Sequence, residues 1–153
     1  MIDALHGEVD RRAAALAARH AAKMACARGC SGCCVDDLTV FAVEAERIRR
    51  GAAALLASGT PHPPGRCAFL GSEGECRIYA LRPYVCRTQG LPLRWLDDDA
   101  EAEYRDICEL NDEIPVETLA PEECWTLGEV EERLARMQGD GKRVPLRDLF
   151  AMS

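Results

Sequence analysis

The stretch Cys26-Ala-Arg-Gly-Cys30-Ser-Gly-Cys33-Cys34 holds four of the nine cysteines of this 153-residue chain. Thiols crowded this closely either pair as disulfides or bind a metal ion. Gly29 and Gly32 provide the backbone freedom of a tight loop, which lets Cys26, Cys30 and Cys33 turn their sulfurs toward one ion. The spacing therefore predicts a metal-ligand cluster.

Three features of the chain favour a metal over disulfides. The chain is long enough to bury a hydrophobic core, so it does not need cross-links to fold. An odd number of cysteines leaves one thiol over from any complete pairing. No secretory leader and no apolar run of about 18 residues is visible, so we expect a cytoplasmic protein with no membrane partner and with reduced thiols.

The adjacent pair Cys33-Cys34 carries separate information. Neighbouring side chains of an extended backbone point to opposite sides, so one tetrahedral site rarely accepts both sulfurs. The pair indicates two metal positions or one multinuclear site. The alternative is that Cys34 is a small buried hydrophobe, as unligated cysteines often are.

A second group of thiols follows the proline-rich loop at 58–65. Residues 67–70 and 76–79 are short strand-like pieces joined by a turn at 71–74, which would place Cys67 and Cys76 across a hairpin from each other. The turn-forming residues 82–85 can bring Cys86 back toward that hairpin. These three thiols and one from the first group would complete a four-sulfur site.

Two later cysteines, Cys108 and Cys124, are candidates for the remaining ligands. The three histidines, by contrast, lack ligand spacing to one another. We therefore expect His6, His20 and His62 to be exposed or packed rather than to bind metal.

The remaining sequence predicts a small single-domain α+β fold over residues 1–153, with helices flanking a cysteine-rich metal-binding loop region that contains one or two short β-hairpins. Helical apolar spacing and capping residues mark the helices, and short strand-like pieces joined by turns mark the hairpins. We expect a helix over 3–24 and a second helix over 38–57, capped by Asp36 or Asp37. A hairpin should pair 91–96 with 102–107 across Asp97–Ala100. A third helix over 126–138 should begin with a Thr126–Glu129 capping box and end at Gly139, and a tail over 144–150 should pack back on the domain.

The charge distribution bears on the partner. A formal net charge of −7 argues against nucleic acid, because phosphate binding needs a basic face. Five arginines nevertheless stand within a few residues of a cysteine, where guanidinium groups can offset thiolate charge: Arg28, Arg66, Arg77, Arg82 and Arg87. The alternative is that arginine is simply the usual cation of a chain with lysine only at 23 and 142.

These motifs together resemble the YkgJ-like cysteine-cluster family, a zinc- or iron-chelating domain. The resemblance covers about residues 26–111 and rests on Cys26-x3-Cys30-x2-Cys33-Cys34, Cys67-Ala-Phe-Leu70, Cys76-Arg-Ile-Tyr79, Arg82-Pro83-x-x-Cys86-Arg87 and Cys108-Glu-Leu-Asn111. It implies metal ligation by Cys26, Cys30, Cys33, Cys34, Cys67, Cys76, Cys86 and Cys108, while Cys124 falls outside the matched part. In the same pattern Arg82 and Arg87 would donate hydrogen bonds to loop carbonyls or thiolates, and Tyr79 would pack over the site.

The leading functional hypothesis is a metal-binding protein that chelates zinc or iron through its cysteines. The first alternative is an iron–sulfur enzyme, redox or methyltransferase-related, because a related domain occurs in flagellin lysine N-methylases and all-sulfur ligation suits iron–sulfur clusters as well as zinc. The third hypothesis is a thiol redox protein that cycles Cys30/Cys33 or Cys33/Cys34. No phosphate loop, dinucleotide-binding turn or nucleophile elbow is present in the sequence to indicate another catalytic class.

Overall fold

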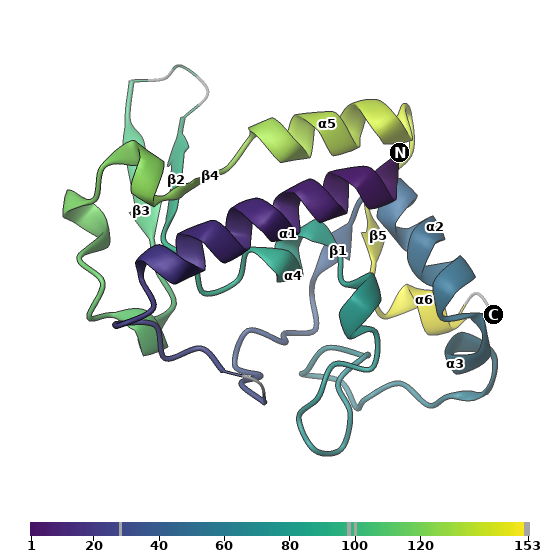
Figure 1. The fold of residues 1–153 in the computed structure, drawn as a ribbon. Coiled ribbons are helices and arrows are strands. Elements are labelled where there is room, and N and C mark those ends of the chain that lie inside the picture. The colour runs from purple at the N-terminus through teal and green to yellow at the C-terminus, as the bar shows by residue number, and fades with distance from the viewer. Residues whose placement is uncertain (28, 98, 100, 152–153) are drawn as a thin grey trace. The chain divides into compact units, whose positions relative to one another are not determined.

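The computed structural model describes residues 1–27, 29–97, 99 and 101–151 (Figure 1). The chain divides into two compact units. The first comprises Met1, Asp3–Cys26 and Arg87–Arg133, and the second comprises Ile2, Ala27–Cys86 and the chain from Leu134 onward. Helices combine with small sheets of two and three strands, which confirms the expected small α+β fold. The assignment of residues 1–153 to one cysteine-cluster domain stays a prediction.

The first unit begins with helix α1 (Ile2–Arg19), which buries Leu5, Val9 and Ala13. The sequence predicted this helix over 3–24, but the structure ends it at Arg19. His20 leaves the helical conformation with φ −101° and ψ 7°, and its Nε2 hydrogen-bonds to the carbonyl of Glu123 at 2.8 Å. A tertiary contact thus stops a segment whose alanine content favours further helix.

The sheet of this unit contains the predicted second hairpin. Strand β2 (Leu93–Leu96) pairs antiparallel with β3 (Glu103–Asp106). Asp98 and Ala100 of the expected turn lie outside the described residues. Strand β4 (Trp125–Thr126) adds to the other edge of β2 in parallel. Three short 3-10 helices complete the unit: η2 (Glu109–Asn111), η3 (Val116–Thr118) and η4 (Pro121–Glu123).

Helix α5 (Glu129–Gln138) begins three residues later than predicted, because Thr126 belongs to β4. The expected capping box is replaced by a hydrogen bond from the Gly128 N–H to the Glu131 side chain at 2.8 Å. Arg133 donates two hydrogen bonds to Glu8, at 2.8 and 2.9 Å, which hold the first turns of α5 alongside α1 (Figure 1). The helix ends before Gly139, at φ 58°, as the sequence predicted.

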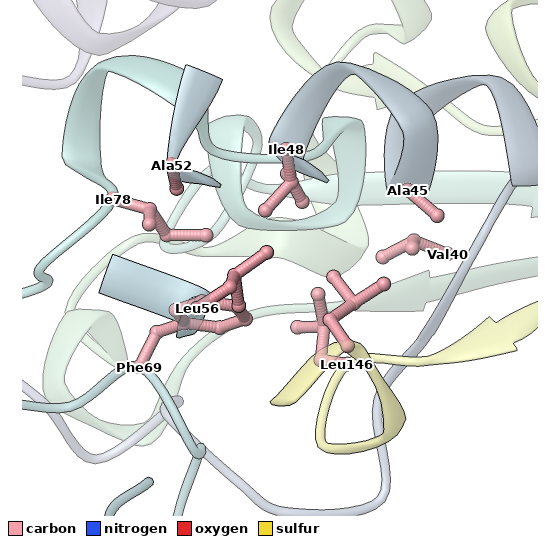
Figure 2. Close-up of a cluster of buried hydrophobic side chains, with 9 residues drawn as sticks. Val40, Ala45, Ile48, Ala52, Leu56, Phe69, Ile78 and Leu146 are labelled. Carbon is pink, nitrogen blue, oxygen red and sulfur yellow. The ribbon is translucent and has the colours of Figure 1, made fainter. Parts of the chain in front are cut away.

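The second unit is built around one cluster of buried apolar side chains (Figure 2). Its helices are α2 (Ala42–Gly51), α3 (Ala53–Ser58), η1 (Tyr79–Leu81), α4 (Tyr84–Arg87) and α6 (Asp148–Ala151), and its two-stranded antiparallel sheet pairs β1 (Thr39–Val40) with β5 (Val144–Pro145). The cluster consists of Val40, Ala45, Ile48, Ala52, Leu56, Phe69, Ile78, Leu146 and Leu149. The burial of Leu146 and Leu149 confirms that the C-terminal segment packs back.

The predicted helix over 38–57 is in fact three elements. Leu38 is followed by β1, and Ala52 breaks the helix between α2 and α3 with φ −118° and ψ 23°. Neither predicted aspartate caps α2: Phe41 precedes the helix, and its N–H donates to the Glu44 carboxylate at 3.3 Å. The apolar stripe expected along this segment is buried at Phe41, Ala45, Ile48 and Ala52. Its last expected member, Leu55, is only partly buried, and Leu56 is buried instead.

No helix in the described part of the chain is long and apolar enough to cross a membrane.

Candidate metal centre

The hairpin predicted over 67–79 forms a single β-bridge instead of two strands, and Tyr79 belongs to the 3-10 helix η1. Leu70 and Cys76 form an antiparallel bridge, and Gly74 makes the turn with φ 82°. Cys67 and Cys76 are partly buried and pack on the apolar cluster of Figure 2. Burial raises the pKa of both thiols, and backbone hydrogen bonds from Phe69 to Cys67 and from Ile78 to Cys76 offset part of that rise.

The third thiol, Cys86, is carried by the single turn of α4. The buried carboxylate of Glu44 accepts the Tyr84 N–H at 2.6 Å and so caps this turn, while it also accepts the Phe41 N–H. Four residues cannot sustain a helix alone. Glu44 therefore ties the turn that carries Cys86 to the start of α2.

The loop that contains Cys30, Cys33 and Cys34 is held from outside. Arg66 Nη2 donates to the Ser31 carbonyl at 2.6 Å, and Arg66 Nε donates to the Cys34 carbonyl at 3.3 Å. The Cys67 N–H also donates to the Cys34 carbonyl, at 2.9 Å. Two successive residues, Arg66 and Cys67, thus dock the backbone of Cys34 beside the hairpin.

The thiols of this unit act on one another electrostatically. Burial, together with the smaller effects of the neighbouring Cys67, Cys76, Cys34 and Cys33, raises the pKa of Cys86 to about 12. Burial likewise raises the pKa of Cys34 to about 11, with contributions from Cys33, Cys67 and Cys76. Neighbouring thiols therefore disfavour the ionised forms of Cys34 and Cys86, and a bound cation would stabilise those thiolates.

The thiols are not assembled into a closed ligand cage. Within the described residues, no three Cys, His, Asp or Glu side chains form a group that could hold a metal ion as they stand. None of the nine cysteines is in a disulfide. The chemistry of the donor set fits zinc and iron, both of which accept thiolate sulfur.

Two of the predicted ligands, Cys26 and Cys108, belong to the first unit. Asn111 is fully buried in this unit. Its Nδ2 donates to Cys26 Sγ at 3.2 Å and to the Gly90 carbonyl at 2.8 Å. Its Oδ1 accepts the Ala25 N–H at 2.7 Å. The Asn111 N–H also donates to the Cys108 carbonyl at 2.7 Å. Asn111 therefore links the two cysteine segments of this unit.

Cys124 has different surroundings. It is buried beside Trp125, and its sulfur accepts a hydrogen bond from Arg105 Nη1 at 3.2 Å. The same nitrogen also donates to the carbonyls of Val116 and Leu119. These contacts are those of a packed thiol.

The residues predicted to support the site differ in their contacts. The Arg82 guanidinium stacks on the exposed Tyr79 ring at 3.6 Å, donates to the Tyr79 carbonyl and lowers the pKa of Cys76. Arg87 is buried and pairs with Asp10 of α1 at 2.5 Å. Arg28 lies outside the described residues. Whether these residues support metal ligation stays a prediction.

Sequence reasoning missed Glu44 and Asn111 and did not single out Arg66 from the other arginines. Asn111 could have been found, because it closes the Cys108-Glu-Leu-Asn111 element. Glu44 carries a weaker signal, an acid directly beside the apolar stripe of α2. The contacts of Arg66 depend on tertiary packing and leave no pattern in the sequence.

Comparison with known protein families gives one match. The CxxCxxCC family model, described as "Putative zinc- or iron-chelating domain", matches residues 25–110. The match covers more than half of the chain, and the chain belongs to this family. Neither the curated proteins nor the solved structures contain a match to the chain.

Proposed function

We propose that this protein binds zinc or iron through a multi-cysteine centre with Cys34, Cys67, Cys76 and Cys86 at its heart. The observation that carries the proposal is the convergence of these thiols from three separate segments, each fixed by a backbone contact or by packing on the core. A structural core made only for stability has no need to bring together thiols whose ionised forms repel each other. A divalent cation bound among them would stabilise the thiolates as its ligands.

Each unit has further candidate ligands. Cys30 and Cys33 stand on the exposed part of the loop that presents Cys34. Cys26 and Cys108, linked through Asn111, are the ligand candidates of the first unit. Membership of the chelating family supports all of these positions, which lie within the matched residues 25–110.

An iron–sulfur or other multinuclear centre is the second candidate. It is favoured by a specific observation: four thiols, Cys33, Cys34, Cys67 and Cys76, raise the pKa of Cys86, and with Cys86 they are one more than a single tetrahedral ion accepts. Such a centre would make a redox or methyltransferase-related enzyme possible.

The test is the metal content of the full chain purified without air, with the visible spectrum and acid-labile sulfide measured on the same sample. We expect at least one zinc or iron per chain, lost in large part in Cys86→Ser. Cys124→Ser is the matched control and should keep the wild-type content. Zinc without colour supports the first candidate, and iron with sulfide supports the second. A metal-free protein with unchanged folding would contradict both.

A further inference from the structure

Arg147 connects the C-terminal segment to the cysteine loops of the second unit. Its position on the fold is fixed on both sides, because Leu146 and Leu149 are buried in the apolar cluster of Figure 2. The Leu146 N–H also donates to the Leu38 carbonyl at 3.0 Å. The backbone at Arg147 is therefore anchored independently of what its side chain binds.

The guanidinium of Arg147 hydrogen-bonds to two segments, one next to Cys34 and one next to Cys67. Nε donates to Asp36 Oδ1 at 2.6 Å, two residues after Cys34. Nη1 donates to the His62 carbonyl at 2.8 Å, and Nη2 donates to the Arg66 carbonyl at 2.8 Å, directly before Cys67. Such a planar group with several donors suits simultaneous binding of a carboxylate and carbonyls.

The segment that Arg147 holds has little order of its own. Residues 59–66 form neither helix nor strand, and the prolines at 61, 63 and 64 have no backbone N–H to donate. The Gly65 N–H donates to Asp36 Oδ2 at 2.8 Å, so the Asp36–Arg147 pair binds the segment through both of its members. Its last residue, Arg66, is the one that docks the backbone of Ser31 and Cys34.

We propose that Arg147 is a positioning residue of the metal centre, which holds Cys34 and Cys67 at the mutual placement that ligation requires. The proposal rests on the proposed function. It also extends the centre beyond residues 25–110, the part that the family model matches. A chain that lacked the C-terminal segment would keep all of its cysteines and still lose this support.

The experiment uses the reduced full chain titrated with Co²⁺, followed by competition with Zn²⁺. Arg147→Gln should weaken zinc affinity by about tenfold or more and alter the sulfur-to-cobalt charge-transfer band. Arg147→Lys, which keeps the charge but loses the planar group, should recover only part of both. The matched control is Arg143→Gln in the same segment, where the native side chain stacks on Phe41 and donates to the Thr39 carbonyl. This control should stay within about twofold of wild type.

The outcomes separate this proposal from the proposed function. If wild type gives a thiolate–cobalt band and Arg147→Gln matches Arg143→Gln, the positioning role is wrong and metal binding stands. If Arg147→Gln lowers only the stability of the metal-free protein and leaves the cobalt spectrum unchanged, its role is structural and the proposal is also wrong. If wild type gives no thiolate–cobalt band, both proposals fail. If Arg147→Gln does not fold, Asp36→Asn decides, because it weakens the same contact isosterically and should alter the cobalt band in the same way.

Discussion

The contact between Gly90 and Cys26 shows how one residue without a side chain can position a thiol. Gly90 has φ 85°, and a Cβ built on it would lie 2.6 Å from Cys26 Sγ and 3.4 Å from Asn111 Nδ2. The position thus demands glycine for its backbone conformation and also for space. Cys26 is held between this glycine and the carboxamide of Asn111.

Replacing Gly90 by alanine should therefore cost more than backbone strain alone. We expect a loss of about 2–4 kcal/mol in the free energy of unfolding, measured by denaturant titration of the reduced protein. Gly65→Ala is the matched control, since Gly65 has φ 98° and nothing within 4 Å of a built Cβ. Its cost should be about 1–2 kcal/mol, that of strain only. In a Cys26→Ala background the cost of Gly90→Ala should fall to the control value. An unchanged cost there would show that Cys26 Sγ is not what the added methyl group meets.

Among the elements, the helices show where sequence patterns were sufficient and where they were not. The apolar stripe of α2 was predictable because it follows from helical periodicity alone. The start of α5 after Thr126 was not, because it depends on a contact with a distant segment. Thr126 satisfies a capping pattern, yet its pairing with β2 prevails over that local preference.

Glu44 connects two helices, because its carboxylate joins the start of α2 to α4. In Glu44→Gln one side-chain oxygen can still accept an N–H, but the amide nitrogen would face the other donor. Leaving a buried donor without an acceptor should cost about 1–3 kcal/mol of unfolding free energy and speed amide hydrogen exchange at Tyr84 or Phe41. Glu46→Gln on the same helix removes an exposed carboxylate 3.6 Å from Arg50 and should change stability by less than about 1 kcal/mol. Equal effects of the two substitutions would contradict the capping role of Glu44.

For the molecule as a whole, the cysteine positions were the predictable part of the candidate site, since their spacing in the sequence already indicates shared ligation. Their division between two units was not predictable. The hydrogen bonds from Arg147 to Asp36 and from Asn111 to Cys26 each span more than 80 residues of sequence and leave no local pattern. A sequence motif can name candidate donors, whereas the groups that hold them in place are defined only by the folded chain.

The metal affinity of the protein should depend on pH. The raised pKa values of Cys34, about 11, and Cys86, about 12, mean that both thiols are protonated at pH 7 in the metal-free protein, and the pKa values of Cys67 and Cys76 are raised as well. Each thiol that becomes a ligand must release its proton. Metal affinity should therefore rise with pH by about tenfold per pH unit for every thiol that binds, between pH 6 and 8.

In the metal-free protein, the same raised pKa values make the folding stability fall as the pH rises. An unfolded thiol ionises near its ordinary value of 9.0, whereas the folded thiols resist ionisation, so their contribution is fully present below pH 9 and is lost as the pH rises toward 11 and 12. Thermal unfolding of the protein stripped of metal by a chelator should thus show falling stability above pH 9. The metal-loaded protein should instead lose its metal-dependent stability on acidification.

Calorimetric titration of the metal-free protein with metal at pH 7, in two buffers of different ionisation enthalpy, gives the number of protons released on binding. A value near zero would mean that the thiols of the second unit are not the ligands, whereas about four would match the centre formed by Cys34, Cys67, Cys76 and Cys86.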